Sequence, residues 1–381
     1  MNIDNIFTRK TSIVSLQEKG RVVIIYGPRR VGKTTMSKEY LVSLDPQYCA
    51  KYEVGDDLVV QNLFNRQNRA EILDYVKPYD VLIIDEAQSI PKIGIGIKMI
   101  IDEDPNKKII LTGSSSFLLS QTIGDALVGR NYSTMLLPLS WGEIFGSNFD
   151  KKRKLHQFLI YGLYPEILLC KEVTLKQIKI QEIISSYLFK DTLSFEGLKS
   201  SELLLNITKA LAFQIGNEVS LLKLAKDVGE NDPKKVARYV SLLEKNFIIK
   251  KVTPFSRNPR NEIKKKGKYY FYDTGIRNAI INRFQKMEDR DSMDIGGLWE
   301  NYVVMELFKK NILENPYFNS LYFWRDKKGN EVDIIIEKNG IIYAYECKWK
   351  KTDASFDVFL ESYPKAKTFV INQENIDELL S

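Results

Sequence analysis

The stretch Gly27-Pro-Arg-Arg-Val-Gly-Lys-Thr34 decides the fold. It matches the pattern G-x-x-x-x-G-K-[ST] at every fixed position, directly after the apolar run Val22-Tyr26 and before a helix expected to begin near Thr34. The two glycines let the backbone curl so that successive N–H groups point inward, and the helix N-terminus adds the positive end of its dipole. This strand–loop–helix context predicts a phosphate-binding P-loop rather than a simple glycine-rich turn.

We expect this loop to bind ATP together with Mg²⁺. Lys33 would lie against the β- and γ-phosphates, and the Thr34 hydroxyl would be a Mg²⁺ ligand. The residues predicted to bind the cofactor are Gly27, Pro28, Arg29, Arg30, Val31, Gly32, Lys33, Thr34 and Thr35.

A second motif, Val81-Leu-Ile-Ile-Asp85-Glu86, is an apolar run that ends in two carboxylates. A buried parallel strand that ends this way would present both side chains at the ligand-binding edge of the sheet. We expect Asp85 to hold Mg²⁺ and Glu86 to polarise the attacking water. A further strand, Tyr48-Val54, lies between the two motifs, as in P-loop proteins that carry a catalytic glutamate and hydrolyse ATP.

Two further residues are candidates for the same site. Ser114 follows the apolar run Ile109-Thr112 and could hydrogen-bond the water or the γ-phosphate, although capping the next helix is an alternative role. Arg130 could place a cation against a phosphate, in this chain or in a neighbouring subunit; an exposed surface arginine is the alternative.

The order of apolar runs predicts an α/β fold: a P-loop parallel sheet with helices on both faces, a helical and winged-helix middle region, and a small α/β nuclease-like C-terminal region. Three helices followed by two strands around a basic loop are a winged-helix pattern, and a mixed-charge linker near 284–294 would lead to a separate small domain. The predicted domains are 1–148 (P-loop ATPase), 149–200 (helical lid or linker), 201–283 (winged-helix-like) and 284–381 (nuclease-like).

The chain resembles prokaryotic AAA-type ATPases that carry a C-terminal domain of unknown function ending in a nuclease-like fold. The resemblance covers nearly the whole length and involves seven blocks in the same order: 26–35, 83–88, 111–116, 129–130, 137–143, 272–275 and 299–303. One departure is Leu163 in the stretch Gly162-Leu-Tyr-Pro-Glu166, where relatives usually carry a second glycine. The resemblance implies an ATPase domain, a winged-helix-like insert and a terminal nuclease-like domain.

Four charged residues in the C-terminal region match the PD-(D/E)xK nuclease pattern: Glu300, Asp333, Glu346 and Lys348. Residues 346 and 348 are two apart, so in a strand both side chains lie on one face. The carboxylates Glu300, Asp333 and Glu346 would bind Mg²⁺ or Mn²⁺, and Lys348 would stabilise charge at the scissile phosphate. Alternatively, the domain binds without cutting.

The region around residue 250 carries a strong positive charge. Lys234, Lys235 and Arg238 share a face of one predicted helix, and Lys264, Lys265 and Lys266 lie in the basic loop. Such residues would contact DNA, the helix in the major groove and the loop at phosphates. A solvated loop and a polar helix face are the alternative.

Composition limits the function classes. The net charge of +7 permits a polyanionic partner, and three scattered cysteines with one histidine build neither a zinc cluster nor a disulfide framework. No apolar stretch approaches the roughly 20 residues needed to span a bilayer. We therefore expect a cytoplasmic protein without a membrane partner.

The motifs support two function hypotheses. The first is a DNA-associated ATPase whose nucleotide state controls a metal-dependent nuclease-like domain. The second is an ATP-driven switch that engages a protein partner, in which the nuclease-like domain is inactive. A homo-oligomer is compatible with both.

Overall fold

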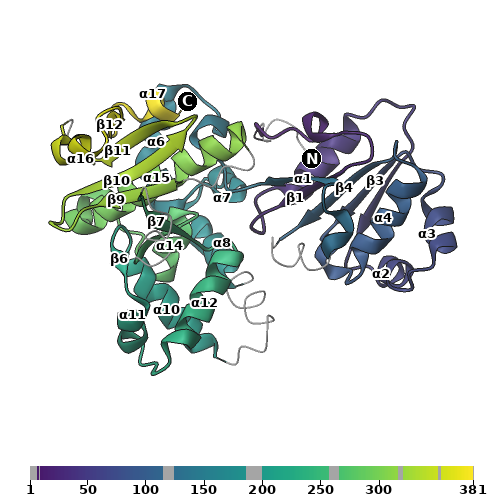
Figure 1. Ribbon diagram of the computed structural model, residues 1–381, viewed down its shortest axis with the longest axis horizontal. Helices are drawn as coiled ribbons and strands as arrows, with labels where there is room; N and C mark the ends of the chain where they lie inside the picture. Colours follow the sequence, from purple (N-terminus) through teal and green to yellow (C-terminus); the bar gives the residue numbers. More distant parts are fainter. Residues whose placement is uncertain are drawn as a thin grey trace. The chain divides into compact units, whose positions relative to one another are not determined.

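The computed structural model describes residues 7, 9–114, 124–185, 200–256, 266–315, 321–350 and 353–380. The chain separates into two compact units (Figure 1). One is Thr8–Leu137; the other combines Met1–Phe7 with Pro138–Ser381. Each unit is described by itself.

The Thr8–Leu137 unit is built on a five-stranded parallel sheet. Its strands are β1 (Val22–Tyr26), β2 (Ala50–Val54), β3 (Val81–Asp85), β4 (Lys108–Gly113) and β5 (Asn131–Met135), in the order β2-β3-β4-β1-β5. The predicted α/β fold with a parallel sheet is confirmed. Because β1, β3 and β4 run parallel to one another, their carboxyl ends lie at the same edge of the sheet, where the P-loop and the acidic pair follow their strands.

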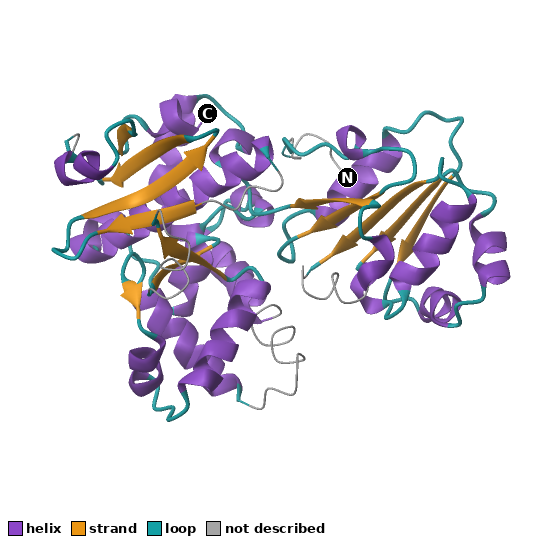
Figure 2. Ribbon diagram, in the orientation of Figure 1, coloured by secondary structure: helices purple, strands orange, loops and turns teal. Residues whose placement is uncertain are grey.

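Helices cover both faces of this sheet (Figure 2). They are α1 (Lys33–Val42), α2 (Leu58–Asn65), α3 (Arg69–Val76) and α4 (Ile93–Glu103). Alternate strand residues such as Ile24 and Ile84 pack with α2, α3 and α4 in one apolar core. Their strand neighbours Ile25 and Ile83 are also fully buried, which is why the central strands read as continuous apolar runs.

The larger unit contains most of the helices. They are α6 (Asn148–Tyr161), α7 (Pro165–Leu169), α8 (Val173–Ile184), α10 (Ser201–Phe213), α11 (Leu221–Asp227), α12 (Pro233–Lys245), α14 (Thr274–Ile280), α15 (Ser292–Glu314), α16 (Asp357–Ser362) and α17 (Ile376–Leu380). The three helices predicted before the basic loop are confirmed as α10, α11 and α12. Asp232 caps α12 by accepting from the Lys234 N–H at 2.8 Å, and Pro233 follows it.

A seven-stranded mixed sheet runs through this unit. Its strands are β6 (Glu218–Val219), β7 (Ile249–Pro254), β8 (Gly267–Phe271), β9 (Leu321–Arg325), β10 (Glu331–Lys338), β11 (Ile341–Cys347) and β12 (Lys367–Ile371), in the order β12-β11-β10-β9-β7-β8-β6. Strand β7 pairs in parallel with β9, placing Thr253 opposite Tyr322. The C-terminal strands therefore continue the sheet of the preceding region, and the assignment of residues 284–381 to a domain of their own stays a prediction.

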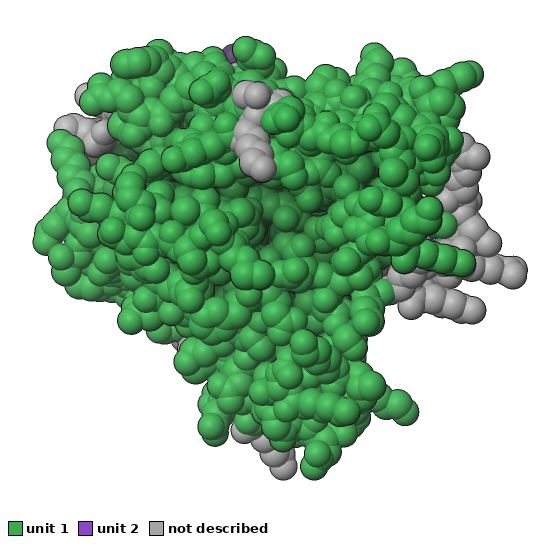
Figure 3. All heavy atoms as spheres, turned by 90° about the vertical axis from the view of Figure 1, so that its left-hand side faces the viewer, with its two compact units in different colours: residues 1–7, 138–381 green, residues 8–137 purple. Residues whose placement is uncertain are grey.

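The long helix α15 lies at the centre of the larger unit. It begins at Ser292, capped by Asp291, so the predicted linker near 284–294 is wrong at its C-terminal end. Trp299 and Val303 are fully buried on α15, as expected for a helix that is covered on most sides. The helix packs against β8 and β11 and thereby joins the two ends of the sheet. Figure 3 shows the surface of this unit.

Candidate functional site

The P-loop connects β1 to α1. Gly27 has φ +150°, and a Cβ there would lie 1.9 Å from the Leu136 carbonyl oxygen, so no other residue fits. Gly32 precedes α1 at φ +101°. The Lys33 ammonium donates to the Gly27 and Pro28 carbonyls at 2.8 and 2.7 Å, and its side chain is buried within its own loop. The predicted loop residues thus form a closed curl around a lysine.

Asp85, at the end of β3, accepts hydrogen bonds from three hydroxyl groups. Thr34 and Tyr52 donate to Oδ2 at 2.7 Å each, and Thr112 donates to Oδ1. Burial raises the pKa of Asp85, but these hydrogen bonds and the Lys33 charge outweigh it and hold the pKa below its ordinary value. The carboxylate is therefore kept ionised, in contact with the hydroxyl predicted to share its metal ion.

Glu86 follows in a left-handed conformation, with φ +53°. Its N–H donates to the Thr112 hydroxyl at 3.2 Å, and a Cβ on Gly55 would lie 2.3 Å from its carbonyl oxygen. Gln88 donates from one Nε2 to the Glu86 carboxylate and to the Ser114 hydroxyl, the latter at 3.2 Å. The structure thus brings Ser114 close to Glu86 through Gln88, while the sensor role itself stays a prediction.

Sequence reasoning missed Tyr52, Thr112 and Gln88. Thr112 and Tyr52 lie on β4 and β2, the two strands beside β3, so their hydroxyls flank Asp85. The sequence did carry a signal for Thr112 and Tyr52. A polar residue near the carboxyl end of a strand beside β3 lies at the same edge of the sheet as Asp85. Gln88 reaches the site through the turn after Glu86, and the hydrophobic periodicity of the sequence does not predict the shape of that turn.

Arg130 lies at the opposite edge of the sheet. Its carbonyl accepts from the N–H of Val22 at the start of β1, and its guanidinium pairs with Asp102. Within this chain it is therefore remote from the P-loop, at the other end of β1.

The set Thr34, Asp85 and Lys33 fits Mg-ATP. Hydroxyl and carboxylate oxygens are the donors that Mg²⁺ prefers, and the loop offers backbone N–H groups and an ammonium for phosphates. Bound Mg²⁺ would neutralise charge on the phosphates.

A second polar cluster lies in the larger unit and contains the four residues predicted for a nuclease. Lys348 pairs with Glu346 at 2.7 Å, and the Asp333 carboxylate accepts from the Cys347 N–H at 2.8 Å. Glu300 comes from α15, where burial and the Asp333 charge raise its pKa to about 7. Burial and the Asp333 charge also raise the pKa of Glu346 to about 7, and burial raises that of Asp333.

Three residues of this cluster were not predicted: Lys268, Tyr270 and Glu331. The Lys268 ammonium lies 2.9 Å from Glu300 Oε1 and also pairs with Glu331. Tyr270 donates to the same Glu300 oxygen at 2.5 Å. Residues 268 and 270 are alternate residues of β8, so a strand assignment places both on one face, but only the fold shows that α15 covers that face.

The predicted metal ligands lie in one cluster, but not in the arrangement of a metal site. In the described parts of the chain, no group of three or more His, Cys, Asp or Glu residues is placed to hold a metal ion. The Asp333 charge acts on both Glu346 and Glu300, and Glu300 is in addition bound to Lys268 and Tyr270. Binding of Mg²⁺ or Mn²⁺ by all three stays a prediction.

The basic residues predicted to contact DNA are partly described. Lys234, Lys235 and Arg238 belong to α12, and Lys235 is paired with Glu230 at 2.7 Å. Lys266 is exposed just before β8. Lys264 and Lys265 lie outside the described residues.

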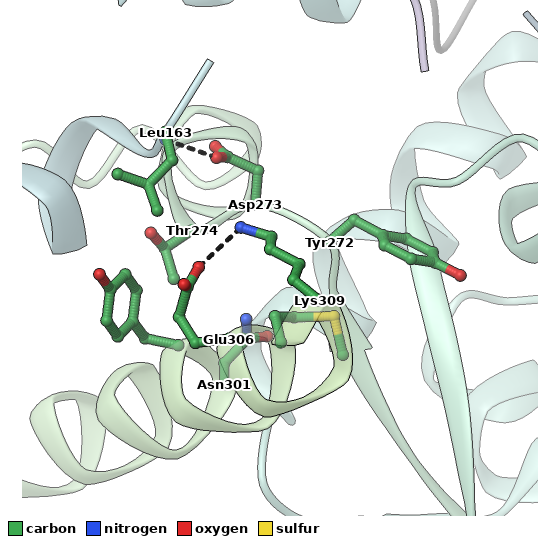
Figure 4. Close-up of a pocket in the computed structure, with 9 residues that line it drawn as sticks. Leu163, Tyr272, Asp273, Thr274, Asn301, Glu306 and Lys309 are labelled. Carbon is green, nitrogen blue, oxygen red and sulfur yellow. Dashed lines mark hydrogen bonds and ion pairs between the residues drawn. The ribbon is translucent and has the colours of Figure 1, made fainter. Parts of the chain in front are cut away.

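A third polar cluster surrounds a cavity of about 10 Å³, roughly the room for one water molecule (Figure 4). Asp273 accepts from the Leu163 N–H at 2.7 Å, and Lys309 donates to Glu306 at 2.7 Å and to the Leu139 carbonyl at 3.0 Å. Residues of blocks 137–143, 272–275 and 299–303 therefore meet at one place. Burial raises the pKa of Asp273. The sequence did not indicate that these three blocks contact one another inside the larger unit.

Comparison with protein families divides the chain into three regions. Residues 19–145 match the model described as "AAA domain", residues 152–287 match "Domain of unknown function (DUF8612)", and residues 295–380 match "Domain of unknown function (DUF4143)". The chain is thus similar to an AAA domain in its N-terminal part and to two domains of unknown function in the rest. No described helix has both the length and the apolar character to cross a membrane.

Similar curated proteins share most of the chain. An uncharacterized protein of Methanocaldococcus jannaschii is 26% identical over 83% of this chain and 72% of its own length. Uncharacterized proteins of Haemophilus influenzae (23%; 78% and 77%) and Mycobacterium tuberculosis (24%; 87% and 71%) are similar to it as well.

Among solved structures, the chain is similar to the replication initiator DnaA bound to AMPPCP and single-stranded DNA. The identity is 16%, the TM-score is 0.31, and the match covers 61% of this chain and 84% of that one. A DNA replication initiation factor matches with 18% identity and a TM-score of 0.30, over 61% and 84%. These similarities are too low to indicate a shared function.

Proposed function

We propose that the protein binds and hydrolyses ATP with Mg²⁺ at the P-loop. The observation that carries this proposal is the 2.7 Å hydrogen bond between Thr34 and Asp85. The two residues come from different motifs, and both were assigned to the same ion. Only a fold that brings the P-loop beside the end of β3 places them in contact.

Each residue then has a defined role. Lys33 turns from the Gly27 and Pro28 carbonyls to the phosphates, and Thr34 and Asp85 hold the metal ion. Glu86 orients the attacking water and accepts its proton, with its carboxylate fixed by the Gln88 amide. Ser114, bonded to the same amide, is in position to respond to the γ-phosphate.

The test is ATP turnover by the full chain, with nucleotide binding measured separately. Glu86→Gln should bind ATP and lose hydrolysis by at least about a hundredfold. Arg130→Ala is the matched control on the opposite edge of the same sheet, and it should keep turnover in the monomeric state. Unchanged turnover in Glu86→Gln would overturn the assignment of the site.

A second proposed activity is metal-dependent cleavage of DNA at the C-terminal cluster. It is supported by the contact between Lys348 and Glu346, with Asp333 beside them, which matches the pattern expected of a nuclease. The test is cleavage of plasmid and single-stranded DNA with Mg²⁺ or Mn²⁺, with and without ATP, by wild type and Lys348→Ala. Cleavage lost in the variant would support the activity. No cleavage under any condition would favour the switch that engages a protein partner.

DNA association is proposed from the middle region. The order α10, β6, α11, α12, β7, β8, with β8 paired to both β6 and β7, supports a winged-helix arrangement. In that arrangement α12, with Lys234 and Arg238, would enter the major groove. Duplex binding that does not weaken as salt rises would contradict this assignment.

A further inference from the structure

The Lys268 ammonium is buried among carboxylates from two other elements. It is 1% exposed, lies 2.9 Å from Glu300 Oε1 on α15, and pairs with Glu331 at the start of β10. The Phe323 ring lies 5.4 Å from it. A buried ammonium is stable only when opposite charges and hydrogen bonds replace its water shell, and here two carboxylates do so.

Helix α15 is fixed in register with β8. The Asn301 side chain accepts from the Phe271 N–H at 2.7 Å and donates to the Phe271 carbonyl at 2.9 Å. The next residue of the helix to the N-terminal side, Glu300, is thereby held over Lys268 and Tyr270. Both side chains donate to its Oε1, so the position of the ammonium does not depend on a flexible loop.

The surroundings of Glu300 do not fit the metal ligand that the sequence predicted. Its Oε1 already accepts from an ammonium and a hydroxyl. Close to Oε2 lies Gly216, where a Cβ would be only 2.8 Å away. A divalent cation bound by Glu300 would have to lie against the fixed positive charge of Lys268, and two cations repel strongly in a buried site.

We propose that Lys268 is the permanent cation of this cluster and occupies the position at Glu300 that the sequence assigned to a metal. Asp333 and Glu346 then bind one divalent cation, and Glu300 is not a ligand. Lys348 also pairs with Glu346, but its side chain is 36% exposed and can turn toward solvent, whereas Lys268 is buried. Mg²⁺ sites with one or two protein carboxylates are common, because water and phosphate oxygens complete the shell. The inference deepens the proposed nuclease-like site, but it concerns cation binding and does not require DNA cleavage.

The first test is Mn²⁺ binding by calorimetry and electron paramagnetic resonance, in nucleotide-free full-length protein. Asp85→Asn is present throughout, so that the P-loop site does not contribute. Asp333→Asn should remove the Mn²⁺ site, whereas Glu300→Gln should leave its affinity within about twofold. If Glu300 is a ligand, Glu300→Gln weakens binding at least about tenfold, and the proposal is overturned. Mn²⁺ binding by the Asp85→Asn parent that Asp333→Asn does not change, or no Mn²⁺ binding by that parent, would overturn it as well.

The second test replaces the lysine. Lys268→Met leaves Glu300 and Glu331 without their cation, so its unfolding temperature should fall and Mn²⁺ should raise it again. In the double variant Lys268→Met/Glu300→Gln, stability should recover without metal. The control is Lys309→Met, which removes another buried ammonium that pairs with one carboxylate, Glu306, and which Mn²⁺ should not rescue. A loss in Lys268→Met that neither Mn²⁺ nor Glu300→Gln restores would refute the proposal.

The two tests separate this proposal from the nuclease activity. The expected pattern of Mn²⁺ binding in a protein that cuts no DNA would support Lys268 as the cation and leave the activity refuted. DNA cleavage that depends on Glu300 as strongly as on Asp333 would support the nuclease activity and refute Lys268 as the cation of the cluster.

Discussion

The two acidic sites of this protein treat their carboxylates in opposite ways. At the P-loop, three hydroxyl donors hold the pKa of Asp85 below its ordinary value. At the C-terminal cluster, burial and neighbouring carboxylates raise the pKa of Glu300 and Glu346 to about 7, even though Lys268 and Lys348 lie among them. The Asp85 carboxylate is ionised, and the groups that donate to it are neutral hydroxyls that can turn toward a bound cation. At the C-terminal cluster, the carboxylates already pair with the ammonium groups of Lys268 and Lys348.

This difference shows why similar motifs need different tests. Carboxylates at strand ends predict metal binding in both regions, but the neighbours decide how many positions remain for a metal. In the P-loop region the groups bonded directly to Asp85 are the hydroxyls of Thr34, Tyr52 and Thr112, and the buried Lys33 bonds to its own loop instead. In the other region a buried lysine pairs directly with a carboxylate, Glu300.

The largest expected effect tests whether Lys33 and Lys348 serve two separate sites. Lys33→Ala should lower ATP hydrolysis at least about a hundredfold, because the phosphates lose their only predicted ammonium partner. Lys348→Ala should keep ATP hydrolysis. Steady-state phosphate release measures both, and equal losses in the two variants would mean that the sites do not act separately.

The next effect concerns Asp333. Asp333→Ala should remove metal-dependent DNA cleavage, by at least about a hundredfold, because one of two carboxylate ligands is lost. ATP hydrolysis should not change. Cleavage is followed on plasmid DNA with Mn²⁺, and cleavage that persists in the variant would sink the assignment of the C-terminal site.

A third prediction uses a glycine beside the C-terminal cluster. Gly216→Ala places a Cβ 2.8 Å from the Glu300 carboxylate at φ +77°, and we expect a loss of about 2–3 kcal/mol in the free energy of unfolding. Gly229 has φ +71° with open space around it, so Gly229→Ala should lose only about 1 kcal/mol. Urea unfolding measures both. Equal losses would show that Glu300 is not held where the structure places it.

A fourth prediction gives the two sites opposite pH dependence. The folded pKa of Glu300 is about 7, above its unfolded value, because of burial and Asp333, with Lys268 and Tyr270 opposing. Stability should therefore fall as pH rises from about 4.5 to 7, by about 1–2 kcal/mol in metal-free buffer. Glu300→Gln should make this slope smaller, and the raised pKa of Glu346 in the same cluster accounts for a further part of it.

Asp85 should behave in the reverse way. Its folded pKa is lowered, so its contribution is present above about pH 4 and is lost as the pH falls through the folded pKa. Asp85→Asn should leave the slope between pH 4.5 and 7 in place. If the fall in stability between pH 4.5 and 7 survived undiminished in Glu300→Gln and vanished in Asp85→Asn, the two sites would have the reverse of the predicted pH dependence.

The smallest effect is expected on the DNA surface. Lys234→Ala and Arg238→Ala should each weaken duplex binding severalfold and lower the salt slope by about one. Lys235→Ala should do less than Lys234→Ala, because Lys235 is already paired with Glu230. Fluorescence anisotropy over a range of salt concentrations measures this difference, and equal effects of Lys234→Ala and Lys235→Ala would count against the role of the Lys235–Glu230 pair.

The fold of the smaller unit could be predicted from the sequence because its signals are local. The run Val22-Tyr26 is β1, with the same bounds, and Val81-Ile84 differs from β3 only by Asp85. Strand β5 begins at Asn131 rather than Thr134, since Asn131 and Tyr132 pair with β1 although both are only half-buried. Pairing of backbone groups is not visible in side-chain pattern.

The C-terminal site was predictable only in part. Asp333, Glu346 and Lys348 follow one another in a hairpin, so their spacing in sequence indicates their proximity. Lys268 lies in a strand that precedes the whole region, and it reaches Glu300 because Asn301 fixes α15 on β8. Long-range packing of this kind leaves no periodic signal in the sequence.

The parallel pairing of β7 with β9 has a consequence for how this protein can be divided. A chain that ended between the regions of the two C-terminal family models would leave one edge of β7 unpaired, open to association with other chains. Recombination between related genes at the same point would separate β7 from β9 in the same way. We therefore expect residues 138–381 to melt in a single cooperative event.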